Sequence, residues 1–237
     1  MYLRGVERRM QVNELLWFVF LIMDLSVLLL MFRFFGKFGL YVVITYSIIL
    51  CNIQVLKIVE LFGLTATLGN VLYGSIFLAT DILGEVYGKE HARKGVYIGF
   101  ISLIIMTAYM QMALLFKPAE ADFIDPHIRA IFSLMPRIMV ASLTAYLVSQ
   151  LHDVWAFHFW KKKTHDRYLW LRNNLSTLMS QFIDSLIFCA IAFMGLYDFR
   201  TWFDILITTY FLKMMVAVLD TPFIYLAKRV ARVVENT

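Results

Sequence analysis

The sequence predicts an all-α integral membrane protein, with a core of six transmembrane helices preceded by one extra N-terminal helix. Of its 237 residues, 61% are hydrophobic and only 16% are charged, whereas soluble domains contain about 45–50% apolar residues. The apolar residues form runs of roughly 20, which is the length that crosses about 30 Å of hydrocarbon as a helix. The composition therefore excludes a soluble globular fold.

Seven apolar stretches are long enough to be membrane spans. The cleanest is Gly95–Phe116, which contains no charged residue. Pro222 lies inside the last stretch and is expected to kink that helix next to Asp220. No linker divides the chain, so we expect the extra helix within residues 1–38 and one six-helix unit over residues 39–237. The remaining stretches are 15–35, 39–60, 65–86, 131–158, 175–197 and 203–227.

Basic residues are distributed unevenly between the loops. Thirteen of the 22 lysines and arginines fall in alternate loops, and six fall on the opposite side. Because cytoplasmic loops contain the excess of Lys and Arg, the larger set is predicted to face the cytoplasm, and with it both ends of the six-helix unit. Topology explains these basic loops, so no nucleic-acid partner is expected. The larger set consists of Arg33, Lys37, Lys89, Arg93, Lys94, Lys161, Lys162, Lys163, Arg167, Arg172, Lys228, Arg229 and Arg232.

The sequence shows no signature of an enzyme or of a metal site. Cys51 and Cys189 both fall inside apolar spans, where small buried hydrophobes are the simplest interpretation. There is no CxxC, HExxH, GxSxG or glycine-rich phosphate loop, and the five histidines are scattered. We therefore expect no catalytic residue, no metal and no cofactor, and an intramembrane enzyme ranks last among the interpretations.

Several ionisable residues lie inside the predicted spans, where each costs about 2.5–3.5 kcal/mol on insertion scales. Asp184 and Lys213 fall near mid-membrane, and Asp24 is the single acidic residue of the first helix, 15–35. Lys57 and Glu60 are three residues apart near an outer helix end, so a local ion pair explains them. The charges near mid-membrane need either a partner or a function.

Two segments repeat one polar pattern inside apolar runs. "VSQLHDVWAF" begins at position 148 and "MSQFIDSLIF" at position 179, with Ser, Gln, Asp and Phe at the same offsets. Gln150 and Asp153, like Gln181 and Asp184, are three residues apart and share one helix face. An amide, a carboxylate and an aromatic ring suit a planar heterocycle with hydrogen-bonding edges. The alternative is that these groups hold helices together, and the spacing leaves both open.

The two copies lie in consecutive spans that run in opposite directions, so they can form facing walls of one pocket. They reach the same depth only if the first helix continues to about Trp160, which the apolar run "VWAFHFW" permits. At 1.5 Å per residue, Gln181 and Asp184 lie roughly 10–15 Å above the cytoplasmic end of their helix. Gln150 and Asp153 reach that level only under this condition.

Five segments resemble the queuosine precursor transporter family, a family of vitamin uptake transporters. They are "CNIQVLK", "ATDILGEVYGKEHARKGVYIGF", "RIMVASLTAYLVSQLHDVWAF", "WLRNNLSTLMSQFIDSLIF" and "KMMVAVLDTPFIYLA". The resemblance extends from about Tyr41 to Lys228, through all six core helices. The first helix, 15–35, has no counterpart in the shorter members of the family.

The resemblance implies a bacterial plasma (inner) membrane importer of 7-cyano-7-deazaguanine, 7-aminomethyl-7-deazaguanine or queuine. A carboxylate accepts from both N1–H and the exocyclic amine of a deazaguanine, and an amide or cation serves O6. Carrying the motifs over gives a substrate-binding set of Asn52, Lys57, Gln150, Gln181, Asp184 and Lys213. The second set, expected to act in gating or ion pairing, is Asp81, Glu85, Arg137, Asp153 and Asp220.

Two transport mechanisms fit six core helices of this length. The first is a self-sufficient transporter that works by alternating access. The alternative is the substrate-capture S subunit of an energy-coupling-factor (ECF) importer, which needs a coupling subunit and ATPases. Such subunits often contain an Ala-xxx-Ala patch in the first core helix, and "LYVVITYSIILCNIQVLKIV" lacks one, which favours the first mechanism. The sequence leaves open the precursor, the driving ion and whether a homodimer forms.

Overall fold

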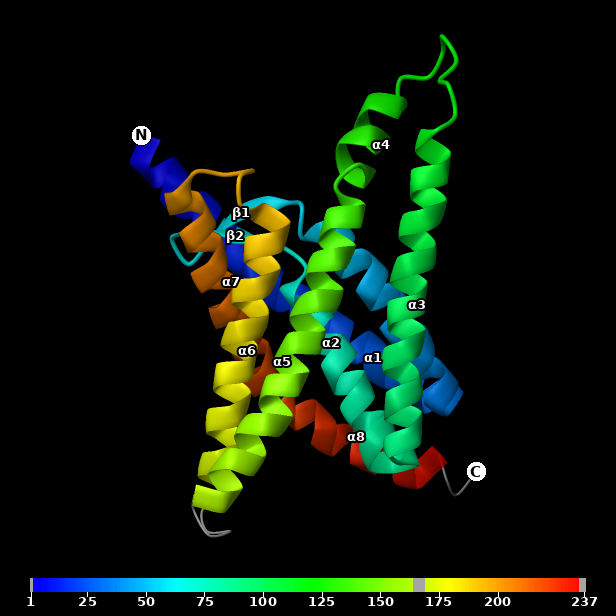
Figure 1. Cartoon of the computed structure of the whole chain (residues 1–237), viewed down its shortest axis with the longest axis vertical. Coiled ribbons are helices and arrows are strands. Elements are labelled where there is room, and N and C mark those ends of the chain that lie inside the picture. The colour runs from blue at the N-terminus through cyan, green and yellow to red at the C-terminus, as the bar shows by residue number, and fades with distance from the viewer. Residues whose placement is uncertain (1, 164–168, 235–237) are drawn as a thin grey trace.

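The computed structural model describes residues 2–163 and 169–234, and nearly all of them are helical (Figure 1). This agrees with the predicted all-α membrane class. The elements are α1 (Tyr2–Gln54), β1 (Ile58–Leu61), β2 (Leu64–Thr67), α2 (Asn70–Ile82), the π-helix η1 (Leu83–Tyr87), α3 (Lys89–Leu114), α4 (Asp125–Phe132), α5 (Met135–Lys163), α6 (Leu169–Phe193), α7 (Phe199–Leu219) and α8 (Thr221–Val234).

Four helical segments in the described ranges are long and apolar enough to cross a membrane. They are Val12–Gln54, Lys89–Leu114, Asp125–Ser149 and Phe199–Leu219. The first has 43 residues, about twice the length that one span needs. The described apolar part of α6, Leu178–Phe193, is shorter. Six core helices plus one therefore remains a prediction, although a multi-pass helical membrane protein is evident.

The break at Gly36 divides α1 into two helices. Gly36 has φ 55° and ψ −135°, a left-handed conformation that glycine adopts without a steric penalty. A Cβ at this position would lie 3.1 Å from the hydroxyl oxygen of Tyr87, so the break packs against the end of η1. The boundary predicted between spans 15–35 and 39–60 falls at this residue.

The prediction of continuous helices over 39–60 and 65–86 is wrong where the two meet. The second half of α1 ends at Gln54, and β1 and β2 form an antiparallel hairpin in which Ile58 pairs with Thr67. The turn of this hairpin contains Gly63 with φ 76°. Lys57 and Glu60 therefore lie at the hairpin and not on a helix, so their expected i,i+3 helical pairing is wrong as well.

Helix α2 is short, and the segment that it forms together with η1 has a glycine on each side. Gly69 precedes it with φ 98°, and a Cβ there would lie 2.6 Å from the carbonyl oxygen of Cys51. After 13 residues the helix passes into η1, and Gly88, with φ 89°, separates η1 from α3. Short π-helical segments often occur at functional sites.

The single span predicted over 203–227 is interrupted. Helix α7 ends at Leu219, α8 begins at Thr221, and Asp220 lies between them. The peptide N–H of Asp220 donates to the carbonyl of Val216 at 2.8 Å, which closes the last turn of α7. The interruption next to Asp220 was predicted from Pro222, but α8 is a separate helix and not a kinked continuation.

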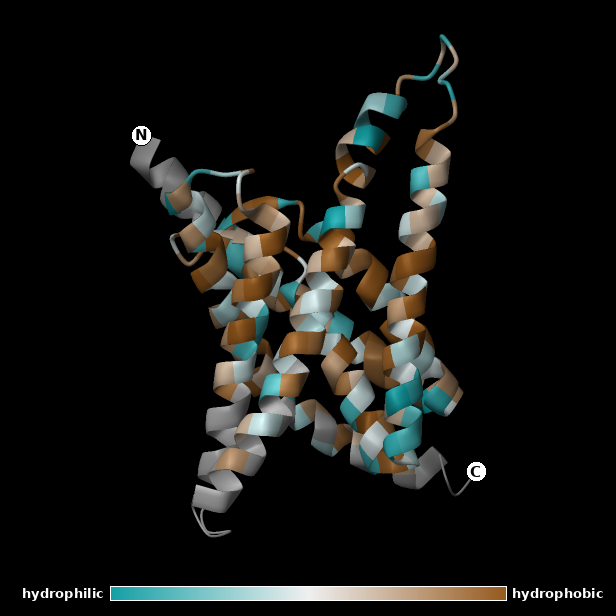
Figure 2. Cartoon of the chain, viewed as in Figure 1, coloured by the Kyte–Doolittle hydropathy of each residue, from teal (hydrophilic) through white to brown (hydrophobic). Residues whose placement is uncertain are grey.

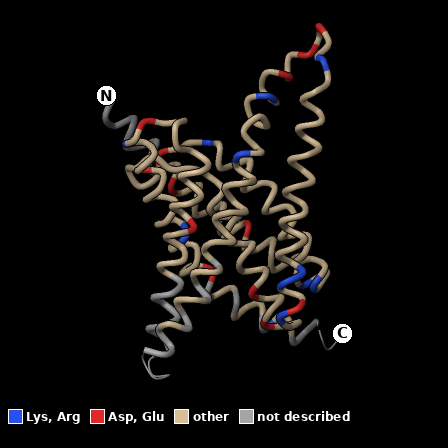
Figure 3. The backbone as a smooth tube through the Cα atoms, in the orientation of Figure 1, with Lys and Arg blue, Asp and Glu red and all other residues tan. Residues whose placement is uncertain are grey.

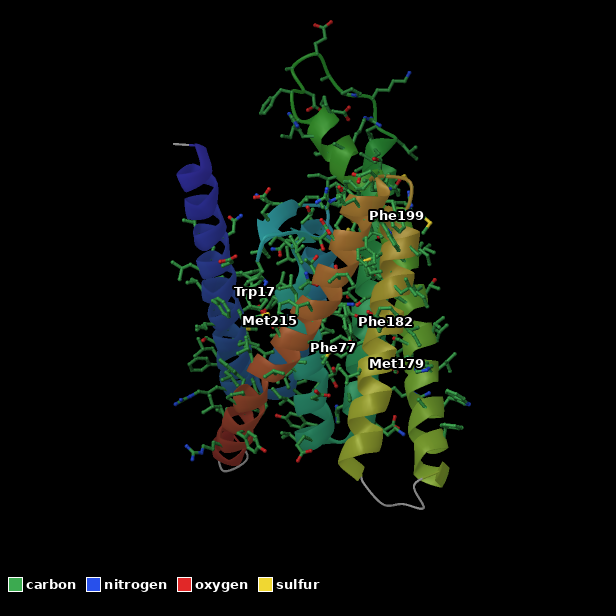
Figure 4. All side chains as sticks on the ribbon, turned by 90° about the vertical axis from the view of Figure 1, so that its left-hand side faces the viewer. Trp17, Phe77, Met179, Phe182, Phe199 and Met215 are labelled. Atoms are coloured by element: carbon green, nitrogen blue, oxygen red, sulfur yellow. The ribbon has the colours of Figure 1, made fainter. Side chains whose placement is uncertain are left out.

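The first half of α1 is packed into the apolar core. Trp17 and Leu25 belong to one buried cluster with Leu78 of α2, Val216 of α7 and Ala227 of α8. Figure 4 shows this half of α1 beside α7 and α8, with Trp17 and Met215 adjacent. A second cluster joins α5, α6 and α7. The first helix thus contributes to the core, and its status as an addition to a six-helix unit remains a prediction.

Charged and apolar residues are separated along the long axis of the molecule. Hydrophobic residues dominate its middle, and hydrophilic residues gather at the α3–α4 connection and where α3 begins (Figure 2). Lys and Arg concentrate at the lower end of the molecule (Figure 3). Gly36 packs on Tyr87 just before α3, and Ala227 of α8 shares a cavity with Lys89. The predicted cytoplasmic clusters of α1, α3 and α8 therefore share one end.

Candidate functional site

A buried ion pair between Asp184 of α6 and Lys213 of α7 forms the centre of the candidate site. The side chains are only 5% and 9% exposed. Both were predicted to lie near mid-membrane, where each needs a partner. Each is now the partner of the other, and removing one leaves the second as an uncompensated buried charge.

Helices α2 and α5 also reach Asp184. The hydroxyl of Tyr73 donates to both carboxylate oxygens, at 3.3 and 3.4 Å. The Tyr73 ring faces Lys213, whose Nζ lies 4.3 Å from the ring centroid, a cation–π geometry. The hydroxyl of Ser149 donates to Asp184 Oδ1 at 3.4 Å. Groups from three helices, α2, α5 and α7, thus converge on one carboxylate of α6.

Asn52, near the end of α1, is the second predicted residue at this site. It is buried, and its Nδ2 donates to the carbonyl of Ile48 at 2.7 Å. Its Oδ1 accepts from the hydroxyl of Ser142 on α5 at 2.6 Å. These two bonds fix the orientation of the amide and join α1 to α5 beside the ion pair.

The converging side chains surround a pocket. The space between their atoms, open solvent included, is about 440 Å³. Apolar side chains form most of the wall, and a few polar groups point into it, a composition that suits an aromatic ligand with polar edges. The lining residues are Cys51, Asn52, Val55, Leu68, Gly69, Asn70, Tyr73, Ser142, Ala145, Asp184, Phe188, Thr209 and Lys213.

A series of cavities leads from this pocket to the end of the molecule where α3 begins. Asn52, Tyr73 and Ser142 line both the pocket and a larger cavity below it. That cavity shares Asp81 with a third one. The third cavity is lined by Glu85 and Lys89 and lies near the basic end. The three cavities therefore follow one another, with shared lining residues, from the pocket to the basic end of the molecule.

The structure brings together three of the six residues predicted to bind substrate. Asn52, Asp184 and Lys213 line the pocket. Lys57 is exposed beside the hairpin and lies outside it, and Gln181 is half-buried about one turn before Asp184 and is not among the lining residues. The side chains of Gln150 and Asp153 lie outside the described residues.

The repeated Ser-Gln-x-x-Asp segments do reach the same depth. Helix α5 continues to Lys163, beyond the point that the depth argument required. Ser149 contacts Asp184, and Nδ1 of His152 lies 3.0 Å from the hydroxyl of Ser180. The described contacts between the two copies thus come from the serines, not from the glutamines.

Two of the residues predicted to act in gating or ion pairing line the cavities, and a third lies near one of them. Asp81 and Glu85 line the cavity nearest the basic end. Asp220, at the α7–α8 junction, is close enough to Asp81 for their charges to interact.

Arg137 has a different environment from the one predicted. Its Nε donates to the carbonyl of Ile191 at 2.6 Å and its Nη2 to that of Met194 at 2.5 Å. The last carbonyls of a helix have no partner within the helix. Arg137 therefore caps the end of α6, and its printed bonds are to backbone oxygens and not to a predicted carboxylate.

Sequence reasoning missed Tyr73 and Ser142, and it gave no role to Ser149, although the repeated pattern contains it. Hydroxyl-bearing residues are common in membrane helices, so none of the three differs from its apolar surroundings as a charge does. The one available signal was the segment "GNVLYGS", where Gly69 and Gly74 flank Tyr73 and indicate close packing of α2. A Cβ at Gly74 would lie 2.1 Å from a methyl carbon of Val216.

Comparison with known proteins gives consistent matches. The model of the family described as "Putative vitamin uptake transporter" matches residues 67–227. A Bacillus subtilis (strain 168) protein named "Probable queuosine precursor transporter" is 45% identical over 218 residues, which are 92% of this chain and 95% of that protein. The "Queuosine precursor transporter" of Escherichia coli (strain K12) is 29% identical over 164 residues, 68% of this chain and 71% of that protein. No solved structure matches the chain.

These matches bear on two earlier expectations. The names are those of transporters, which agrees with the prediction that the chain is not an enzyme. Only 19 residues of the chain lie outside the match to the Bacillus protein. At least residues 20–35 of the first helix therefore have a counterpart there, unlike in the shorter family members.

Proposed function

The chain belongs to the vitamin uptake transporter family, and from this premise we propose that it imports queuosine precursors through the pocket at Asp184 and Lys213. The names of its relatives support the substrate class. The observation that supports the location is the buried Asp184–Lys213 pair, with Tyr73 between the two groups. Charged side chains at membrane depth are costly and usually serve a function, so the buried pair favours a role in binding.

The polar groups of the pocket complement a 7-deazaguanine. Asp184 accepts hydrogen bonds from N1–H and the exocyclic amine, the two donors on one edge of the ring. Lys213 and Asn52 can donate to O6. The ring lies against Tyr73 and Phe188, which supply aromatic faces. On binding, the two donors of the ligand replace the Tyr73 and Ser149 hydroxyls on the carboxylate while Lys213 stays beside it, so the two charges remain paired.

We further propose transport by alternating access. The cavities below the pocket lead toward Lys89, so this conformation releases substrate at the basic end, which the charge distribution assigns to the cytoplasm. On the other side the pocket is covered by Leu68 and the β1–β2 hairpin. The hydroxyl of Thr208 on α7 donates to the carbonyl of Thr65 at 2.9 Å and holds the hairpin in place. Loading from outside requires this cover to move.

A genetic experiment tests the proposed function. The chain is expressed alone in a host that cannot make queuosine and lacks any ECF coupling subunit, and each precursor is supplied at low concentration. We expect queuosine in tRNA with the wild-type chain and none with Asp184→Ala at equal membrane abundance. Restoration only when a coupling subunit and its ATPases are added would identify an S subunit. Failure under both conditions would contradict the function.

The orientation is tested separately. A cysteine placed at Lys162, at the end of α5, is expected to react with a membrane-impermeant thiol reagent only after the cells are opened. Reaction in intact cells would reverse the orientation and make the cavity series an entry route.

A further inference from the structure

Asp24 is a second buried carboxylate, and the proposed substrate site does not use it. It is 4% exposed, on the first half of α1. It lies twelve residues from Val12, where the apolar segment starts, and twelve from the break at Gly36. At 1.5 Å per residue each distance is about 18 Å, so Asp24 lies near the middle of the hydrocarbon.

The groups that face Asp24 provide no opposite charge. From α2, the hydroxyl of Ser75 donates to Asp24 Oδ2. From the second half of α1, Tyr46 lies close enough to interact with its charge, and the buried Tyr46 hydroxyl has no hydrogen-bond partner among the described residues. Helices α7 and α8 contribute apolar side chains to this cluster, among them Val216 and Ala227. No described lysine or arginine forms an ion pair with Asp24.

This environment differs from that of Asp184 in one respect that determines its chemistry. Asp184 has Lys213, so it can remain ionised in the membrane. An uncompensated carboxylate at this depth is costly, whereas a neutral carboxyl is not. Because its neutral form avoids that cost, a proton is the ligand that Asp24 is suited to bind.

Helix α2 connects Asp24 with the substrate pocket. Ser75 and Tyr73 are two residues apart, so they point to nearly opposite sides of α2. Ser75 contacts Asp24, and Tyr73 contacts Asp184 and Lys213. Between them Gly74 packs directly on Val216 of α7. A displacement of α2 at Ser75 therefore also changes the contacts that Tyr73 makes with Asp184 of α6 and Lys213 of α7.

The two ends of the segment formed by α2 and η1 suit such a displacement. Gly69 and Gly88 both have positive φ, and η1 interrupts the regular α-helical hydrogen bonding between them. Hinges are commonly a few residues at element ends that absorb changes in backbone angles. Helix α2 can therefore tilt as a unit while α1 and α3 remain in place.

From this geometry we propose that Asp24 is the proton-coupling site of the transporter. The ionised carboxylate accepts one proton from the outer side and becomes a neutral carboxyl. This changes its bond to Ser75, because the carboxyl now has its own O–H donor. Release of that proton to the inner side restores the carboxylate and completes one cycle per substrate molecule. The proton gradient is the energy source, and the inference rests on the proposed transport function.

Proteoliposomes that contain the full chain separate coupling from transport. Exchange of labelled for unlabelled 7-cyano-7-deazaguanine at equal pH needs no coupling, whereas accumulation against a gradient does. We expect the wild-type protein to do both and a protonophore to abolish only the accumulation. Asp24→Asn, which mimics the neutral carboxyl, should exchange within twofold of wild type and lose at least tenfold in pH-driven accumulation.

Two further variants and a matched control keep the test decisive. Asp24→Glu retains a carboxyl and should restore part of the pH-driven accumulation. Asp122→Asn makes the same change in an exposed loop and should behave as wild type. If Asp24→Asn does not fold, Tyr46→Phe should lower accumulation several-fold at unchanged exchange. Wild-type accumulation by Asp24→Asn, or accumulation driven by sodium and not by pH, would overturn the proposal. Absence of exchange in the wild type would instead contradict the transport function.

Discussion

The Nζ of Lys213 lies 4.3 Å from the centroid of the Tyr73 ring, while the hydroxyl of the same tyrosine donates to Asp184. One side chain of α2 thus contacts both members of the ion pair between α6 and α7. A ligand that binds Asp184 must displace the Tyr73 hydroxyl, and this displacement is how occupancy of the pocket can reach α2. The following predictions test the parts of this arrangement.

Removing Asp184 separates the function of the ion pair from its contribution to stability. Asp184→Ala leaves the Lys213 ammonium buried without a partner, which costs about 3–5 kcal/mol, so we expect lower thermal stability and no uptake. The double variant Asp184→Ala with Lys213→Ala removes the orphan charge. It should recover much of the stability in detergent and none of the uptake. Uptake by the double variant would show that the pair only joins helices.

Tyr73 is expected to contribute to precursor binding through its ring and not through its hydroxyl. Tyr73→Phe keeps the ring over Lys213 and removes a hydrogen bond to Asp184, worth about 1 kcal/mol, that the ligand has to displace, so precursor affinity should stay equal or rise by about fivefold at most. Tyr73→Leu also loses the cation–π contact, worth about 2 kcal/mol where it is desolvated, and should weaken binding by tens of fold. Equal effects of the two variants would mean that the ring has no role.

Protection from thiol reagents maps the pocket and tests the repeated motif. In a chain without Cys51 and Cys189, cysteines are placed singly at Ser142 and at Gln181. Ser142→Cys lines the pocket and should be protected by 7-cyano-7-deazaguanine. Protection at Gln181 as well would support the motif prediction that its amide binds the ligand. Protection at Gln181 alone would place the ligand outside the pocket described above.

Arg137 should affect stability more than transport. Lysine cannot donate to both carbonyls at the end of α6 as the guanidinium does. Arg137→Lys is therefore expected to lose about 1 kcal/mol of stability and to transport within twofold of wild type once folded. The matched control is Arg129→Lys, whose partner Asp125 is at the surface and whose effect should be negligible. Loss of transport at unchanged stability would favour the predicted gating role.

The sequence predicted the helices well where apolar length alone decides the structure. The run from Gly95 to Phe116 became most of α3, and the boundary at Gly36 was recognised. The hairpin was missed because strands of four residues inside apolar sequence give no periodicity that distinguishes them from helix. Gly63 and Gly69 were the available signals, and they are compatible with a helix junction as well.

The site was predictable only where a charge made a residue conspicuous. Asp184 and Lys213 were singled out because burial of a charge is costly, and the structure pairs them. The two copies lie at one depth because α5 continues past Trp160, the condition on which the sequence prediction depended, but helix spacing cannot say which side of a helix faces its neighbour. The rotation of each helix about its own axis depends on packing. Here it directs Ser149 toward Asp184 and leaves Gln181 outside the pocket lining.

The central claim is that the Asp184 carboxylate recognises the N1–H and amine edge of a 7-deazaguanine, and one binding measurement tests it most directly. Purified full-length protein is titrated with 7-cyano-7-deazaguanine and with the analogue that lacks the exocyclic amine. Because a buried carboxylate then loses one of its two donors, the analogue should bind at least tenfold more weakly to the wild-type protein. With Asp184→Asn, the natural ligand should weaken and the preference between the two compounds should largely disappear. Equal affinity of the wild-type protein for both compounds would contradict the account.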